Sequence, residues 1–339
     1  MRKYERIVQQ EWNRTDKTQK HKHKPPKRHE HFSTSRNNNN IEASNIMVTT
    51  SRVGDDGDNA LDIHSVPVQR NLVVDAGHLA SKRHIIHGFI EVDVTKAQLM
   101  RREHSFSFTA FVIASLAHAV ALHPQVQGML TPRGNRVVVF RNVDVATMIE
   151  PHSGGDAFPH IIRNAQARSV QDIGQELHDV KHQNPVQSPQ QQQPNHRSVE
   201  FYARLPRCIR LGIFRWMMRK PQRRQKLMGT VSLSSVGMFG GTGGGYAIGY
   251  LPCHTMGIFV GGMAQKPRVV VDPTTGATKM EMRHYVCLSL QFDHDVVDGA
   301  PAARFTKTLT DLMESASVLL LDEEAPKTRS HHSYASAAW

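Results

Sequence analysis

The stretch "HYVCLSLQFDHDVVDGAPAARF", residues 284–305, decides which fold this chain adopts. Its first nine residues, 284–292, are rich in branched and aromatic side chains, which is typical of a buried β-strand. His294 follows directly, and Gly299 then permits a tight turn before a segment with an apolar stripe, 301–320. The stretch therefore predicts a strand, a histidine held at its end, a tight turn and a helix.

The histidine of this unit is a candidate for proton transfer. Imidazole takes and returns a proton near neutral pH without a large shift of its pKa. Asp293, Asp295 and Asp298 surround His294 in the sequence, and a carboxylate can fix the tautomer and orientation of such a ring. The pattern H-x-x-x-D-G is weak on its own, because it often occurs by chance, so a purely structural histidine stays the alternative.

Two serines end another expected strand, residues 229–237. Ser234 and Ser235 lie in "VSLSSVG", where a hydroxyl could donate a hydrogen bond to a developing oxyanion. Ordinary turn serines are the alternative interpretation. Neither serine stands in G-x-S-x-G, so the sequence does not indicate a nucleophile elbow.

The other patterns predict helices and strands in alternation. Alternating apolar residues and β-branched runs predict strands, whereas longer apolar stripes predict helices. Thr95 and Gln98 have the spacing of a capping box, and His118 is interpreted as a core histidine. We expect strands at 84–94, a hairpin from 136–140 and 143–149, two strands within 256–271, helices at 108–123 and 169–182, and a flexible loop at 238–245.

Composition divides the chain into one domain and its flanks. Only 39% of the 339 residues are hydrophobic, which is low for a fully packed chain. We expect a disordered basic tail at 1–66, one domain at 67–322 with a polar and basic insertion at 184–228, and a disordered tail at 323–339. The first tail carries four histidines that could bind a metal ion, although a soluble basic segment explains them more simply: His21, His23, His29 and His31.

Positive charge gathers in one segment. The formal net charge is +12, and residues 195–226 hold ten Lys and Arg against one acid, Glu200. Apolar residues recur there at helical spacing. The segment therefore predicts a helix that either packs on the core with its arginines reaching solvent, or lies on an anionic membrane or RNA. Because the rest of the chain is nearly balanced, we expect no nucleic-acid partner.

Targeting and redox signals favour the cytoplasm. No apolar run approaches the roughly 18 residues of a membrane span, so we expect no transmembrane segment. The first residues lack the apolar core of a secretory signal. Cys208, Cys253 and Cys287 are scattered, which favours a reducing compartment and argues against a disulfide framework or a metal site.

Several motifs in order resemble one known family. "TVSLSSVGMFGG" and "LSLQFDHDVVDGAPAARFTKTLTDLME" are similar to the catalytic domain of the 2-oxoacid dehydrogenase acyltransferases, the dihydrolipoamide acyltransferases. "SFTAFVIASLAHAVALHPQVQGML", "VVVFRNVDVATMIEP" and "IIRNAQARSVQDIGQEL" match in order and spacing. The resemblance covers roughly residues 83–182 and 228–320. It implies a two-layer α/β sandwich with a mixed β-sheet, of the kind shared with chloramphenicol acetyltransferase.

The resemblance also implies a mechanism and partners. His294 would be the general base that deprotonates a thiol, hydroxyl or amine acceptor, which then attacks the thioester of acyl-CoA directly. Ser234 would hydrogen-bond the oxyanion, with Ser235 as second choice, and Asp298 would brace the loop and the histidine. Coenzyme A would be the donor substrate. The active site would lie between subunits of a homotrimer, with 2-oxoacid dehydrogenase components as further partners.

Three departures from the family narrow this expectation. Asp295 stands where the family usually has arginine. The negative charge of Asp295 would raise the pKa of a nearby imidazole. We find no lipoyl-attachment hairpin in the chain, and the insertion at 184–228 is long and basic. These features favour a stand-alone acyltransferase with a different acceptor. Two alternatives remain: a scaffold subunit with weakened catalysis, and a surface-binding module that uses residues 195–226.

Overall fold

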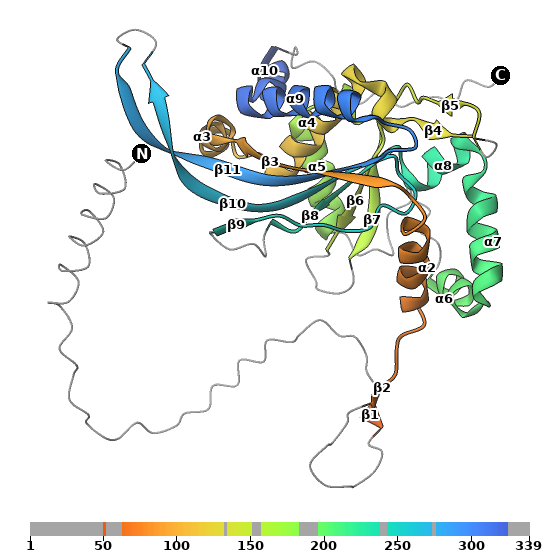
Figure 1. Cartoon of the computed structure of the whole chain (residues 1–339). Helices are drawn as coiled ribbons and strands as arrows, with labels where there is room; N and C mark the ends of the chain where they lie inside the picture. Colours follow the sequence, from red (N-terminus) through yellow and green to blue (C-terminus); the bar gives the residue numbers. More distant parts are fainter. Residues whose placement is uncertain are drawn as a thin grey trace, which may run out of the picture. The chain divides into compact units, whose positions relative to one another are not determined.

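A seven-stranded mixed sheet organises the part of the chain that the structure describes. This structure is a computed structural model, and it describes residues 50–51, 63–131, 134–150, 157–182, 196–237, 243–272 and 276–324. The chain divides into Met1–Ala43 and Ser44–Trp339, and all described residues belong to the second unit. The strand order is β3-β11-β10-β8-β6-β7, with β9 also paired to β10 (Figure 1).

Two adjacent parallel pairs at the middle of this sheet are flanked by antiparallel pairs. β10 pairs in parallel with β8, β8 in parallel with β6, and the other neighbours are antiparallel. The strands are β3 (Ile85–Asp93), β6 (Val145–Ile149), β7 (Phe158–Ile162), β8 (Val231–Ser235), β9 (Gly243–Gly245), β10 (Met256–Val271) and β11 (Thr278–Asp293). Two short pairs lie outside it: β1 (Thr50–Ser51) with β2 (Ile63–His64), and β4 (Met129–Leu130) with β5 (Val137–Val138).

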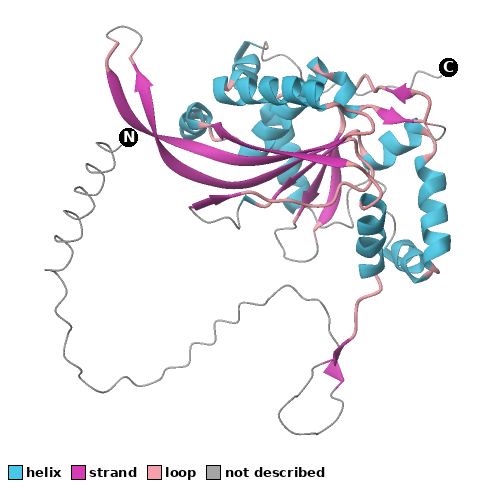
Figure 2. Cartoon of the chain, viewed as in Figure 1, coloured by secondary structure: helices cyan, strands magenta, loops and turns pink. Residues whose placement is uncertain are grey.

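Helices pack on one face of the sheet and form the second layer (Figure 2). This layer comprises α3 (Thr95–His104), α4 (Phe108–Leu122), α5 (Val170–His182), α9 (Gly299–Ser315) and α10 (Ser317–Glu324). Short 3-10 turns occupy Pro124–Gln127 and Ala165–Ala167. The mixed sheet covered by helices confirms the expected two-layer α/β fold.

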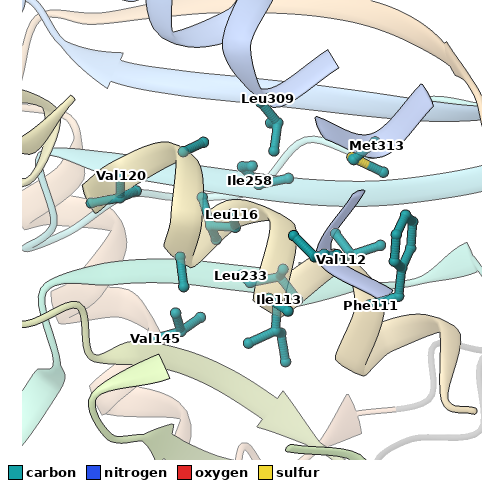
Figure 3. Close-up of a cluster of buried hydrophobic side chains, with 14 of the residues drawn as sticks. Phe111, Val112, Ile113, Leu116, Val120, Val145, Leu233, Ile258, Leu309 and Met313 are labelled. Atoms are coloured by element: carbon teal, nitrogen blue, oxygen red, sulfur yellow. The ribbon is translucent and has the colours of Figure 1, made fainter. Parts of the chain in front are cut away.

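Helix α4 lies at the centre of the core. Its side chains are apolar around nearly the whole circumference, because it contacts α5, α9 and the sheet at once. Figure 3 shows Leu116 of α4 near Leu233 of β8 and Ile258 of β10. On the same helix, His118 is partly buried and its Nδ1 lies 3.0 Å from the Ala114 carbonyl, as expected for a core histidine.

One expected pair of strands is a single long strand. Residues 256–271 form β10 without interruption, with a register shift against β11 between Val260 and Met263. The bulge spans Gly261 and Gly262, so the strand continues through them. Pro267 is tolerated because β10 pairs only with β11 at that level, so the missing N–H faces away from the sheet.

The expected hairpin between 136–140 and 143–149 is wrong. β5 pairs with β4, whereas β6 lies inside the main sheet between β7 and β8. The alternation in the sequence predicted both strands correctly. Their partners depended on contacts with residues far along the chain, which the local pattern does not contain.

Part of the expected flexible loop is a strand. Residues 238–242 lie outside the described residues, but Gly243–Gly245 forms β9 beside β10. A Cβ on Gly261 would stand only 2.0 Å from the Gly245 carbonyl oxygen, so the absence of a side chain permits this close approach. The glycines thus serve backbone packing here.

Two helix ends also differ from expectation. Thr95 is the first residue of α3 instead of its cap, and the Asp93 carboxylate accepts from both the Thr95 N–H, at 3.0 Å, and its hydroxyl. The expected helix 301–320 begins at Gly299 and ends at Ser315, because Ala316 adopts a left-handed conformation with φ 52°.

The basic insertion forms three helices instead of one. They are α6 (His196–Arg204), α7 (Arg207–Met218) and α8 (Pro221–Met228). α2 (Arg70–Ala80), which the sequence patterns did not predict, holds them through Asp75: Arg210 donates to this buried carboxylate at 2.6 and 3.2 Å. A buried guanidinium without a partner would destabilise the fold, so this ion pair fixes α7 against α2.

Some expectations lie outside the described residues. These are most of the 1–66 tail with its four histidines, the polar linker after α5, and the tail from residue 325. Among the described residues, no helix is long and apolar enough to cross a membrane.

Candidate functional site

The turn after β11 presents His294 to solvent on a fixed backbone. The His294 N–H donates to the His84 carbonyl at 2.8 Å, and the Asp293 N–H donates to the Thr255 carbonyl at 2.8 Å. The carbonyl of Asp293 accepts from the N–H of Val296, three residues further along, at 3.0 Å. The imidazole of His294 is exposed. The backbone is therefore held on both sides while the ring stays free to meet a second molecule.

A buried ion pair anchors the residue before the histidine. Arg83 donates from Nε to Oδ2 of Asp293 at 2.9 Å, and its Nη2 contacts the same oxygen. Asp293 is almost completely buried. Because a buried carboxylate without a partner is costly, Arg83 is required for this turn to keep its conformation. Arg83 was not predicted as a site residue.

The neighbouring pair, His84 and Asp295, lies on the surface beside His294. Nδ1 of His84 and Oδ1 of Asp295 are 2.8 Å apart, and the two side chains are 78% and 46% exposed. The hydrogen bond and the charge of Asp295 raise the pKa of His84 above its ordinary value of 6.5. The structure thus gives Asp295 a partner that the sequence patterns did not indicate. No local pattern could have indicated it, because Arg83 and His84 reach this turn only through the pairing of β3 with β11.

Ser234 and His294 do not meet within one chain. Ser234 lies opposite Phe259, and Phe259 lies opposite Ser289, which is five residues before His294 along β11. With about 3.4 Å per residue along a strand and about 4.8 Å between strands, the two residues are separated by roughly 15–20 Å. Proton transfer and oxyanion stabilisation at one carbonyl need groups within about 3 Å of the reacting atoms.

Asp298 occupies the start of α9. It is the N-cap residue, with an extended backbone, and its carbonyl accepts from Ala302 at 3.1 Å. Its side chain makes no cap hydrogen bond. In the described turn, the side chains that brace the backbone around His294 are those of Asp293 and Asp295.

The sheet face opposite the helices carries the serine. Ser234 shares this face with Phe259, Ser289 and Gln291, because alternate residues of paired strands point the same way. The chain after β9 crosses this face, where Gln291 donates to the Gly249 carbonyl at 2.8 Å. In the described residues the Ser289 hydroxyl is buried there without a hydrogen-bond partner. Ser234 therefore lies on a sheet face that also carries polar side chains of β11.

The arrangement defines a class: a mixed-sheet α/β domain with an exposed histidine at the end of a central strand. Residues 218–321 match the 2-oxoacid dehydrogenases acyltransferase (catalytic domain) family. This segment is therefore similar to a catalytic domain of this family, and the resemblance expected from the sequence is confirmed.

Curated relatives agree with this assignment. The chain is 21% identical over 240 residues to the dihydrolipoyllysine-residue acetyltransferase component of the pyruvate dehydrogenase complex of Corynebacterium glutamicum. It is 23% identical over 253 residues to the lipoamide acyltransferase component of the branched-chain alpha-keto acid dehydrogenase complex of Pseudomonas aeruginosa. The alignments cover 67% and 71% of this chain, but only 30% and 49% of the two relatives.

Solved structures share the fold. The cubic core of a pyruvate dehydrogenase multienzyme complex aligns with a TM-score of 0.55 at 19% identity, covering 76% of this chain and 94% of the other. Dihydrolipoamide acetyltransferase of Azotobacter vinelandii aligns with a TM-score of 0.53 at 18% identity and the same coverage. The Azotobacter structure was studied for the role of a serine, a histidine and an asparagine in the catalytic mechanism.

Proposed function

We propose that this chain transfers an acyl group from acyl-CoA to a thiol, hydroxyl or amine acceptor, through a domain at residues 67–322. His294 removes the proton of the acceptor, and the acceptor attacks the thioester carbonyl directly. The carbonyl oxygen becomes an oxyanion, which then reforms the double bond as the CoA thiolate leaves and takes up the proton from His294. The exposed imidazole on its fixed turn is the observation that carries this proposal.

Ser234 stabilises the oxyanion from a neighbouring copy of the chain. A hydroxyl donor aimed at a developing oxyanion lowers the barrier most when it is fixed in advance. Because Ser234 and His294 lie far apart within one chain, a complete site needs the serine of one subunit and the histidine of another. A homotrimer supplies such pairs in a closed ring of identical contacts.

One position differs from the Azotobacter enzyme. Its asparagine lies four residues after its histidine, and the corresponding residue here is Asp298. An ionised carboxylate accepts hydrogen bonds but donates none, whereas an amide does both. Asp298 therefore contributes its negative charge, which favours an imidazolium formed at His294 during proton transfer.

The chemistry of the proposed reaction suggests an acceptor, and the cysteines suggest a compartment. A lipoyl thiol on another protein is one acceptor of the right chemistry, and 2-oxoacid dehydrogenase components would then be partners. The buried, unpaired Cys253 and Cys287 suit a reducing compartment such as the cytoplasm.

The test is a comparison of wild-type protein with His294→Asn, measuring thiol release from acetyl-CoA with a panel of acceptors that includes dihydrolipoamide. Loss of a general base lowers the rate by on the order of 10²–10⁴-fold. His104→Asn, at an exposed histidine of α3, is the matched control and should leave the rate unchanged. Equal background rates for wild type and His294→Asn would instead support a scaffold subunit.

A further inference from the structure

The outer face of α7 combines an aromatic side chain with positive charge. Trp216 is 59% exposed, and Ile209, two turns earlier on the same face, is also exposed. Arg215 and Arg219 are exposed beside the tryptophan. The guanidinium of Arg223 on α8 lies 4.2 Å from the centroid of the Trp216 ring. We call this set, with Lys220, the α7 face.

The cations of the α7 face are not used in ion pairs within the described part of the chain. Arg204 pairs with Glu200, and Arg210 and Arg207 pair with Asp75. In the described residues, no carboxylate lies within ion-pair distance of the remaining cations, which are Arg215, Arg219, Lys220 and Arg223. Their charge is therefore available to an external anion.

The positive field reaches the neighbouring helix. On α2, the pKa of His78 is lowered by desolvation and then by the charges of Arg207, Lys82 and Arg215. Cations of α7 and of the turn after α2 thus act on one surface group. A surface of this kind attracts anions over several ångströms at moderate ionic strength.

We propose that the α7 face binds the surface of an anionic lipid bilayer. Tryptophan and isoleucine enter the boundary between headgroups and acyl chains, while the surrounding arginines contact anionic headgroups. Arginine keeps its charge in this setting and meets phosphate groups in two-point contacts. The helix lies in the plane of the membrane and does not cross it.

Charge and composition favour a bilayer over two other occupants. A second copy presenting the same face would bring like charges together, which is unfavourable. RNA offers phosphates and stacking bases but no apolar phase for exposed aliphatic side chains such as Ile209 and Leu227. A bilayer accommodates both the charge and the aliphatic groups.

Cys208 provides a local probe for the test. It is the exposed cysteine on α7, whereas Cys253 and Cys287 are buried, and the chain has three cysteines in all. A polarity-sensitive fluorophore on Cys208 of the full chain should gain emission intensity with phosphatidylglycerol-containing vesicles but not with pure phosphatidylcholine vesicles. The gain should fall as sodium chloride rises.

Two variants separate the charge from the apolar contribution. Arg215→Glu with Arg219→Glu should weaken vesicle binding by roughly a hundredfold. Trp216→Ala should weaken it by roughly tenfold while keeping the charge. The control is Lys96→Glu with Arg102→Glu, the same charge change on exposed residues of α3, which should bind nearly as wild type. Acyl transfer should survive in all of these, because none of the residues belongs to the proposed site.

Three outcomes would overturn the proposal. Equal fluorescence with both kinds of vesicle would remove the role of charge. Equal weakening by the α3 control would remove the role of the α7 face. A signal that rises with protein concentration or with an RNA oligomer, but not with vesicles, would assign the face to a second copy or to RNA.

Discussion

At the scale of residues, two cation–anion pairs hold the turn that carries His294. Arg83 and His84 are adjacent in the sequence. Arg83 pairs with Asp293, directly before His294, and His84 pairs with Asp295, directly after it. The inner pair is buried and fixes the backbone, whereas the outer pair is exposed and raises the pKa of His84 above its ordinary value. The imidazole between them is thereby positioned by its backbone, and among the described residues its ring makes no hydrogen bond or ion pair.

Removing the carboxylate of Asp295 should change the titration of His84. In Asp295→Asn, the pKa of His84 should return toward its ordinary value of 6.5, because the hydrogen bond and charge that raise it are gone. The pair stabilises the fold below pH 6.5 and ceases to do so as pH rises through the raised pKa of His84. The stability difference between wild type and variant should therefore shrink as pH rises.

NMR titration of the His84 ring protons measures this directly. His104, an exposed histidine on α3, serves as the internal reference in both proteins. An unchanged His84 titration in Asp295→Asn would contradict the assigned pair.

At the scale of elements, glycines let the backbones of β9 and β10 approach closely. β9 lies against the bulge of β10, where Gly261 and Gly262 leave room for Gly244 and Gly245. From this contact the chain crosses the sheet face that carries Ser234. The close packing of β9 therefore helps to set the surroundings of the serine.

Gly261→Ala should disturb this packing. Its Cβ would meet a backbone oxygen at 2.0 Å, which only a backbone shift can relieve. We expect a loss of about 1–3 kcal/mol in the free energy of unfolding, measured with urea. Gly88→Ala on β3 is the matched control, because a Cβ there meets nothing within 4 Å. Similar losses in both variants would show that the close approach is unimportant.

At the scale of the whole molecule, the register of the sheet separates the serine from the histidine. The strands that carry them are two neighbours apart, and their positions along the strand differ by five residues. Nothing short of unfolding the sheet would bring them together in one chain. The active site we propose is therefore a property of the assembly.

Mixing two inactive variants tests this conclusion. Ser234→Ala and His294→Asn should each have low activity alone. When the two are co-expressed, some subunit pairs contain an intact serine and an intact histidine, so part of the wild-type rate should return. Because neither variant regains activity with itself, an absence of recovery in verified mixed oligomers would place both residues in one subunit's site.

The sequence by itself determined the strand–histidine–turn–helix unit, the resemblance to an acyltransferase family and the layers of the fold. These follow from local patterns: apolar alternation along β11, the apolar circumference of α4, and Gly299 at the turn. The tertiary structure alone decided which strands pair with β6 and how far Ser234 lies from His294. It alone also decided the ion pair between Asp75 of α2 and Arg210 of α7, and the pairs that Arg83 and His84 make with Asp293 and Asp295. Each of these depends on pairing between residues far apart in the chain, which is selected by the packing of the complete core and not by any local pattern.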